Sequence, residues 1–73
     1  MSSLSERLIE LKTSRKLLQK DIADSIGVPL RTYQRYEYGE REPNASLLTS
    51  LADFFNVSTD YLLGRTDNPE INR

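Results

Sequence analysis

The sequence predicts an all-α protein, a compact bundle of five short helices. Apolar residues recur at spacings of three and four along the chain, and no stretch alternates between apolar and polar residues as a half-buried strand does. Four of the five apolar runs end at a glycine or an asparagine, the residues that most often stop helices. A chain of 73 residues has room for one small domain only.

The first helix is expected to begin near Ser3 and to fade by Thr13 or Ser14. Ser3 and Glu6 have the spacing of a capping box, in which each side chain bonds the backbone N–H of the other. The leucines behind this cap repeat at i, i+4 and i+7 and form one face: Leu4, Leu8 and Leu11.

The next two helices are short and are joined by a tight turn. The first should run from Gln19 to about Ser25, with Gly27 free to take the positive φ that ends it. The second should have Pro29 in its first turn, where no N–H is needed, and should end before Gly39. Their apolar stripes are Ile22, Ala23 and Ile26 in the first helix and Tyr33 and Tyr36 in the second. This arrangement is a helix-turn-helix.

The last two helices are predicted from their caps and stops. Asn44 suits the N-cap of the fourth helix, and Asn56 suits a left-handed stop. Ser58 can cap a fifth helix that runs through Leu63 and ends at Gly64. The fourth helix has a broad apolar stripe, formed by Leu47, Leu48, Leu51, Ala52 and Phe55.

The domain is therefore expected to occupy residues 1–64, and residues 65–73 to form a loose, polar C-terminal tail. No apolar run approaches the ~18 residues of a membrane-spanning helix, and the start MSSLSERL lacks the apolar core of a signal peptide. We expect a cytoplasmic protein with no membrane partner.

The composition argues against an enzyme. The chain has no cysteine and no histidine, so the usual metal ligands and the usual general base are missing. It also has no glycine-rich loop for a phosphate and no acidic cluster at metal-binding spacing. We expect no catalytic residue, no metal and no cofactor.

The charge is distributed unevenly along the chain. The formal net charge is −1, which by itself argues mildly against a nucleic-acid partner. Residues 12–41, however, hold seven basic and four acidic side chains, a net +3, whereas residues 42–73 hold two basic and five acidic ones, a net −3. A modestly basic face with few phosphate contacts is therefore expected.

One face of the third helix carries side chains that suit DNA. Within an arc of ~140°, at about 100° per residue, lie Leu30, Arg31, Gln34, Arg35 and Tyr38. Arginine and glutamine fit guanine and adenine edges in the major groove, and leucine can meet a thymine methyl group. The alternative is a solvated polar face on an ordinary amphipathic helix. The preceding helix and glycine turn favour DNA, because they would hold the third helix out from the surface.

In order and spacing, several segments resemble the lambda-repressor-like, or xenobiotic-response-element, helix-turn-helix family. The resemblance extends from about Leu8 to Arg65. The residues that carry it are Gln19, Ile22-Ala23, Ile26-Gly27-Val28, the run from Tyr36 to Pro43, the run from Leu51 to Ser58, and the run from Asp60 to Gly64.

The resemblance implies roles for particular residues. The third helix is expected to enter the major groove of double-stranded DNA, where the residues that contact bases are Leu30, Arg31, Gln34 and Arg35. Phosphate contacts are expected from Gln19, Lys20, Thr32, Tyr38 and Arg41, although Lys20 and Arg15 can equally be solvated surface charges. Lys12 and Glu37 should form an internal ion pair, and Phe54 and Tyr61 are the candidates for a dimer surface. Arg35 has a second interpretation, an ion pair with Glu37 or Asp24.

Three residues depart from the family pattern. Leu18 stands at the N-cap of the second helix, where the family has Ser, Thr or Asn, so a capping bond worth ~1 kcal/mol is absent. Lys16 stands where a glycine is common, so its loop is strained or takes another path. Leu30 is apolar at a leading base-reading position, so hydrogen-bond readout cannot apply there.

The function expected from the sequence is that of a DNA-binding transcriptional regulator. One recognition helix touches too few base pairs for genomic specificity, so we expect a homodimeric repressor on an inverted repeat. The alternative is a protein-interaction module on the same fold, such as an antitoxin or an antirepressor. The operator, the regulated genes and any inducer stay open, as does repression against activation.

Overall fold

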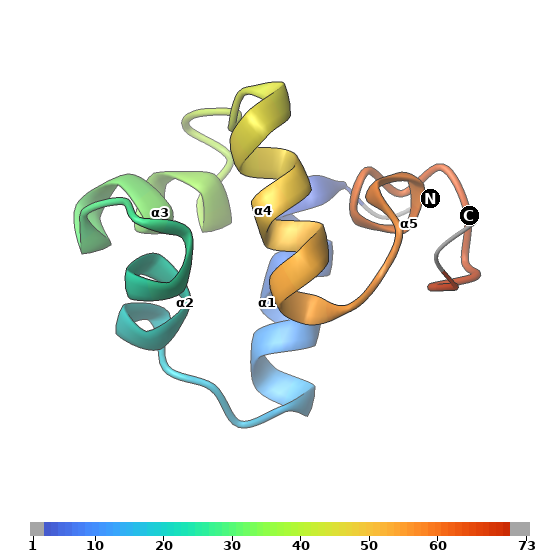
Figure 1. The fold of residues 1–73 in the computed structure, drawn as a ribbon, viewed down its shortest axis with the longest axis horizontal. Coiled ribbons are helices and arrows are strands. Elements are labelled where there is room, and N and C mark those ends of the chain that lie inside the picture. Colours follow the sequence, from blue (N-terminus) through green and yellow to red (C-terminus); the bar gives the residue numbers. More distant parts are fainter. Residues whose placement is uncertain (1–2, 71–73) are drawn as a thin grey trace.

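The structure, a computed structural model, describes residues 3–70. This part of the chain contains five helices (Figure 1). They are α1 (Leu4–Ser14), α2 (Gln19–Ile26), α3 (Leu30–Glu37), α4 (Ala45–Phe55) and α5 (Thr59–Leu62). In Figure 1, α2 and α3 lie on one side of α4, and α5 lies on the other, near both ends of the chain. The all-α, five-helix prediction is confirmed.

The core takes side chains from every helix. Its buried members are Leu8, Leu11, Ile22, Ala23, Ile26, Tyr33, Tyr36, Leu51, Ala52, Phe55, Val57 and Leu62. Each large side chain removed from water contributes roughly 1.5–3 kcal/mol, before the cost of ordering the chain. Tyr33 and Tyr36 are 0% and 2% exposed, which confirms that the two tyrosines of α3 face inward.

Local caps set most of the helix boundaries. Ser3 and Glu6 form the predicted capping box at the start of α1. Asn44 Oδ1 accepts from the backbone N–H of Leu47 at 2.8 Å, and Ser58 Oγ caps α5 in the same way. Leu18 makes no side-chain capping bond at α2, as expected.

Small corrections concern three helix ends. Pro29 is the N-cap of α3, with extended backbone angles, and does not lie inside its first turn. The helix α2 continues one residue past Ser25, to Ile26. The helix α5 ends at Leu62, so Leu63 is its C-cap. Each shift amounts to one residue, because frayed terminal turns are the least constrained part of a helix.

The loop between α1 and α2 is strained at Lys16. Its φ is 55°, in the left-handed region, and its N–H donates to the Thr13 carbonyl at 3.2 Å. The next N–H, that of Leu17, donates to the Lys12 carbonyl at 3.0 Å. The loop thus keeps the sharp path that suits a glycine, and the side chain of Lys16 costs roughly 1 kcal/mol there.

The segment that the sequence predicts to be a loose tail is attached to the helices as far as it is described. Residues 65–70 form no helix, but Pro69 O accepts from the backbone N–H of Ser58 at 2.9 Å. The side chain of Arg7 donates to Thr66 O and to Asp67 Oδ1, each at 3.3 Å. Residues 71–73 of the predicted tail lie outside the described part. Within residues 3–70, no helix has the length and apolar character needed to cross a membrane.

Candidate nucleic-acid interface

The interface is built on the pair of helices α2 and α3. Gly27 ends α2 with a φ of 75°, and the N–H of Val28 donates to the Ala23 carbonyl at 3.1 Å. This turn directs the chain into α3, whose buried tyrosines join the core beside Ile22 and Ile26. Since the inner face of α3 is held by packing, its other face is fixed toward solvent.

The outer face of α3 carries the side chains predicted to read bases. Arg31 and Arg35 are exposed, Leu30 is 41% exposed, and Gln34 is half-buried. Together with Tyr38 and Glu40, the two arginines and Gln34 line a shallow hollow of about 180 Å³. The structure therefore brings the four predicted base readers onto one helix face.

The two arginines of this face form no ion pair within residues 3–70. Glu37 pairs with Lys12, and Asp24 lies 3.7 Å from Lys20, so neither carboxylate neutralises Arg35. The alternative of an ion pair for Arg35 is thus not realised. Two guanidinium groups free to bind a guanine edge or a phosphate face solvent from one helix.

A buried ion pair lies behind this face. Lys12 Nζ and Glu37 Oε1, the pair implied by the family resemblance, are 2.9 Å apart, and the Glu37 side chain is only 2% exposed. Removing one partner of such a pair leaves an uncompensated charge and costs roughly 3–5 kcal/mol. Glu37 is therefore part of the internal structure and does not contact solvent from the outer face.

Hydrogen bonds extend this ion pair to the outer face. Gln19 Nε2 donates to Glu37 Oε1 at 3.1 Å, and Gln34 Nε2 donates to Gln19 Oε1 at 3.0 Å. Sequence reasoning assigned Gln19 to a phosphate and missed both of these bonds. One N–H of Gln19 is left for a phosphate oxygen, since its amide nitrogen has two.

The Glu37 carboxylate also neighbours the phenol of Tyr33. Neither Glu37 Oε2 nor the Tyr33 hydroxyl has a hydrogen-bond partner of standard geometry. Burial raises the pKa of the Tyr33 phenol well above its ordinary value, and the neighbouring Glu37 carboxylate raises it further. Tyr33 consequently keeps its proton to higher pH than an exposed tyrosine does.

The predicted phosphate contacts are spread around the edge of this face. Gln19 and Lys20 lie in the first turn of α2, where Leu18 provides no side-chain cap for the first N–H groups. Such open N–H groups attract anions. The others are the half-buried Thr32 in α3, the C-cap Tyr38, 62% exposed, and the exposed Arg41 after α3. Arg15, the further alternative, lies 5.6 Å from the ring centroid of Phe55.

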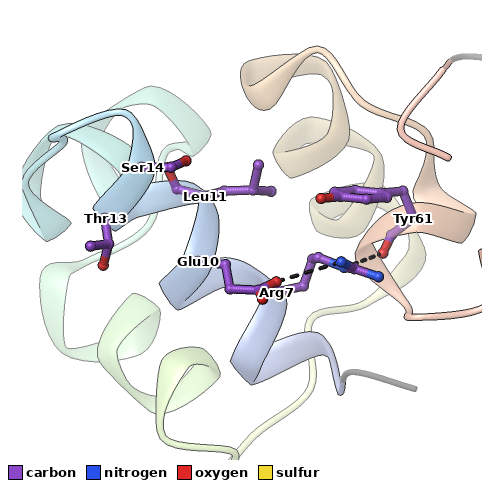
Figure 2. A pocket seen from close by; sticks show the side chains of 6 residues that line it. All are labelled: Arg7, Glu10, Leu11, Thr13, Ser14 and Tyr61. Atoms are coloured by element: carbon purple, nitrogen blue, oxygen red, sulfur yellow. Dashed lines mark hydrogen bonds and ion pairs between the residues drawn. The ribbon is translucent and has the colours of Figure 1, made fainter. Parts of the chain in front are cut away.

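The candidate dimer residues lie on α4 and α5, outside the α2–α3 pair. Phe54 is half-buried and meets the ring of Phe55 edge-on, with centroids 5.0 Å apart. The ring of Tyr61 stacks on the guanidinium of Arg7, whose Cζ lies 3.9 Å from the ring centroid. Both residues line a pocket of about 500 Å³ between α1 and α5 (Figure 2). The structure does not bring these residues near the base-reading face, which lies on α3.

Arg7 is a buried structural residue that sequence reasoning missed. It is 6% exposed, and its Nε donates to the Tyr61 carbonyl at 3.0 Å, a bond drawn in Figure 2. The available signal was its helical phase, three residues after Leu4 and four before Leu11. A charged residue on an apolar face indicates a partnered, buried group.

Comparison with known proteins identifies this architecture. A helix-turn-helix family profile matches residues 8–62 of the chain. The chain belongs to the lambda-repressor-like helix-turn-helix family. This family is one of transcriptional regulators rather than of enzymes. Within residues 3–70, no three His, Cys, Asp or Glu side chains are grouped so that they could hold a metal ion.

Two curated relatives are transcriptional regulators by their descriptions. The uncharacterized HTH-type transcriptional regulator YobD of Bacillus subtilis is 37% identical over 65 residues, which are 89% of this chain and 58% of YobD. The cryptic phage CTXphi transcriptional repressor RstR of Vibrio cholerae is 37% identical over 85% of this chain and 55% of its own. The chain thus spans little more than half the length of either relative.

The solved structure is that of the P22 c2 repressor in complex with a synthetic operator. It superposes with a TM-score of 0.81 at 28% identity, over 86% of this chain and 96% of that one. The five-helix fold is thus shared along nearly the whole length of that repressor chain.

Proposed function

We propose that this chain binds double-stranded DNA as the operator-reading domain of a transcriptional regulator, with α3 in the major groove. The observation that carries the proposal is the outer face of α3, where Arg31 and Arg35 point outward with no ion-pair partner in residues 3–70. The similarity to a repressor solved in complex with a synthetic operator supports DNA as the partner. The base contacts are Leu30, Arg31, Gln34 and Arg35.

Phosphate contacts hold the helix in the groove. They come from Gln19, Lys20, Thr32, Tyr38 and Arg41, and the open N-terminus of α2 adds backbone N–H donors. These contacts fix the register of the protein without reading sequence. Because they are few, we expect the affinity to fall less steeply with salt than it does for strongly basic proteins.

The regulator is proposed to act as a homodimeric repressor on an inverted repeat. The relative RstR is a repressor by its description, which supports that direction of regulation. Phe54 and Tyr61 would lie at the dimer surface and would place two copies of α3 about 34–36 Å apart, one turn of DNA. Sedimentation with and without the selected DNA site tests this, and a one-to-one complex on an asymmetric site would contradict it.

The experiment that tests DNA binding is selection of bound sites from a random double-stranded library. We expect an enriched site with two-fold symmetry, and a double variant Arg31→Ala/Arg35→Ala that folds, as judged by circular dichroism, but enriches nothing. A chain with no affinity for any fragment would contradict the proposal and favour the protein-interaction alternative.

A further inference from the structure

The buried side chain of Glu37 begins a chain of hydrogen bonds that reaches the outer face of α3. Glu37 is 3% exposed, and its Oε1 accepts from Lys12 Nζ at 2.9 Å and from Gln19 Nε2 at 3.1 Å. Gln19 Oε1 in turn accepts from Gln34 Nε2 at 3.0 Å. A deeply buried carboxylate is thus connected to a side chain that lines the exposed hollow on α3.

The chemistry of these groups gives the chain of hydrogen bonds one direction. A carboxylate only accepts hydrogen bonds, whereas a glutamine amide has one accepting end and one donating end. Facing Glu37, Gln19 must present its Nε2, so its Oε1 faces Gln34. Gln34 must then direct one N–H of its Nε2 toward Gln19, which leaves its second N–H and its Oε1 for the DNA.

We propose that Glu37 is a positioning residue that, through Gln19, makes Gln34 select adenine over guanine. Adenine presents an N7 acceptor and an N6 amino donor in the major groove, and these match the free N–H and the Oε1 of Gln34. Guanine presents two acceptors, N7 and O6, so its O6 would face the Oε1 of Gln34. The inference rests on the proposed DNA-binding function of α3.

The variant Glu37→Gln is expected to release this constraint. In the parent, Lys12 and Gln19 both donate to the same oxygen, Oε1 of Glu37. The introduced amide can present either its oxygen or its nitrogen to Gln19, so Gln19 is no longer held in one orientation. When the amide nitrogen faces Gln19, Gln19 can donate its Nε2 to Gln34 Oε1, and both N–H groups of Gln34 are then free to face the groove. Adenine then loses its advantage, because both purines offer acceptors to those groups.

The test measures base preference at one position of the site selected by the parent chain from a random double-stranded library. Gln34→Ala identifies the position that Gln34 reads, and the affinities for adenine and guanine at that position are then compared. We expect the parent to prefer adenine by about five- to 150-fold. Glu37→Gln should lose most of that preference while keeping the preference at the position read by Arg31.

A matched double variant, Gln19→Glu/Glu37→Gln, moves the carboxylate one step along the chain of hydrogen bonds. The carboxylate introduced at position 19 accepts from Gln34 Nε2, and the amide introduced at position 37 donates to it and accepts from Lys12. We expect the adenine preference to return although the overall affinity falls, because the new negative charge lies near the phosphates. If Glu37 acted on stability alone, the double variant would not recover the adenine preference while its overall affinity stayed low.

A third variant, Gln19→Leu, tests the inference even if Glu37→Gln fails to fold. Gln19→Leu breaks the link to Gln34 but leaves the ion pair between Lys12 and Glu37 intact, and we expect it to lose the adenine preference too. The inference is wrong if either link-breaking variant keeps that preference, if the double variant fails to restore it, or if Gln34→Ala alters no position. In each of these cases the selected site still supports DNA binding, whereas a parent chain that selects no site overturns both proposals.

Discussion

Individual side chains of α3 divide between two tasks according to the helix face on which they lie. Tyr33 and Tyr36 are buried and hold the helix against the core, whereas Arg31 and Arg35 are exposed. Substitutions on the two faces should therefore have different consequences. Changes to the outer face should alter DNA binding at constant stability, and changes to the inner face should alter stability first.

Arg31→Ala tests the outer face. We expect the discrimination at one base position of each half-site to fall by about 1–3 kcal/mol, because a bidentate guanine contact is lost. The measurement is a set of binding titrations on the selected site and its single-base variants. Arg65→Ala is the matched control, since Arg65 lies outside the helix pair and only approaches Asp60 at 4.0 Å. Equal weakening on every sequence would instead make Arg31 a phosphate contact.

Tyr33 tests the inner face through its raised pKa. An unfolded tyrosine loses its proton near pH 10. In the folded protein, burial and the Glu37 carboxylate keep the proton on Tyr33 to higher pH. Above about pH 10 the unfolded chain therefore binds fewer protons than the folded one, and the stability present at lower pH is lost as pH rises.

In that alkaline range the unfolding free energy falls as pH rises, and we expect Tyr33→Phe to make this fall less steep. Urea unfolding at a series of pH values measures it. Tyr38→Phe is the control, because Tyr38 is 62% exposed. An unchanged slope in Tyr33→Phe, or an equal change in Tyr38→Phe, would contradict this explanation.

The helices themselves are set mainly by local signals. The capping box of α1, the Asn44 cap of α4 and the left-handed stops at Gly27 and Asn56 each involve residues within four positions of one another. The loop between α1 and α2 lacks such a signal. There Lys16 has a φ of 55° with no glycine to tolerate it.

Replacing Lys16 should reveal this strain. Lys16→Gly removes the Cβ that makes left-handed backbone costly, whereas Lys16→Ala removes the long side chain but keeps the Cβ. We expect the glycine variant to be more stable than the alanine variant by about 0.5–1 kcal/mol in urea unfolding. A more stable alanine variant would show that the backbone at this position is not strained.

At the scale of the whole molecule, Arg7 connects the two ends of the described chain. From α1 it donates to the carbonyls of Tyr61 and Thr66, it pairs with Glu10 and Asp67, and it lies over the Tyr61 ring. Arg7 itself is 6% exposed, whereas the side chains of its partners Glu10 and Asp67 are 59% and 99% exposed. This one side chain attaches α5 and the segment after it to α1.

Arg7→Met keeps much of the side-chain volume but removes every donor. Because the carbonyls of Tyr61 and Thr66 lose a charged donor, we expect the unfolding free energy to fall by roughly 1–3 kcal/mol. The exposed carboxylates of Glu10 and Asp67 add little to this loss. We also expect faster amide hydrogen exchange in α5 than in α2 or α3. Arg65→Met, at an exposed ion pair, should cost at most about 1 kcal/mol. An equal loss in the two variants would contradict the role of Arg7.

The sequence by itself determined what depends on residues close together in the chain. Helix positions followed from periodicity and caps, and the inward tyrosines and outward arginines of α3 followed from helical phase. These features could be predicted because a cap or a stripe is complete within one or two turns of helix. The pairing of Lys12 with Glu37 came instead from the family resemblance.

Only the tertiary structure determined which groups the buried polar side chains contact. Gln19 and Gln34 are 15 residues apart, and Arg7 meets partners 54 to 60 residues away, so no local pattern could reveal either contact. Their directions are fixed when the helices pack and an amide or guanidinium leaves water, because a buried donor must then find an acceptor. The same requirement attaches residues 65–70, a segment without helical periodicity, to the body of the protein.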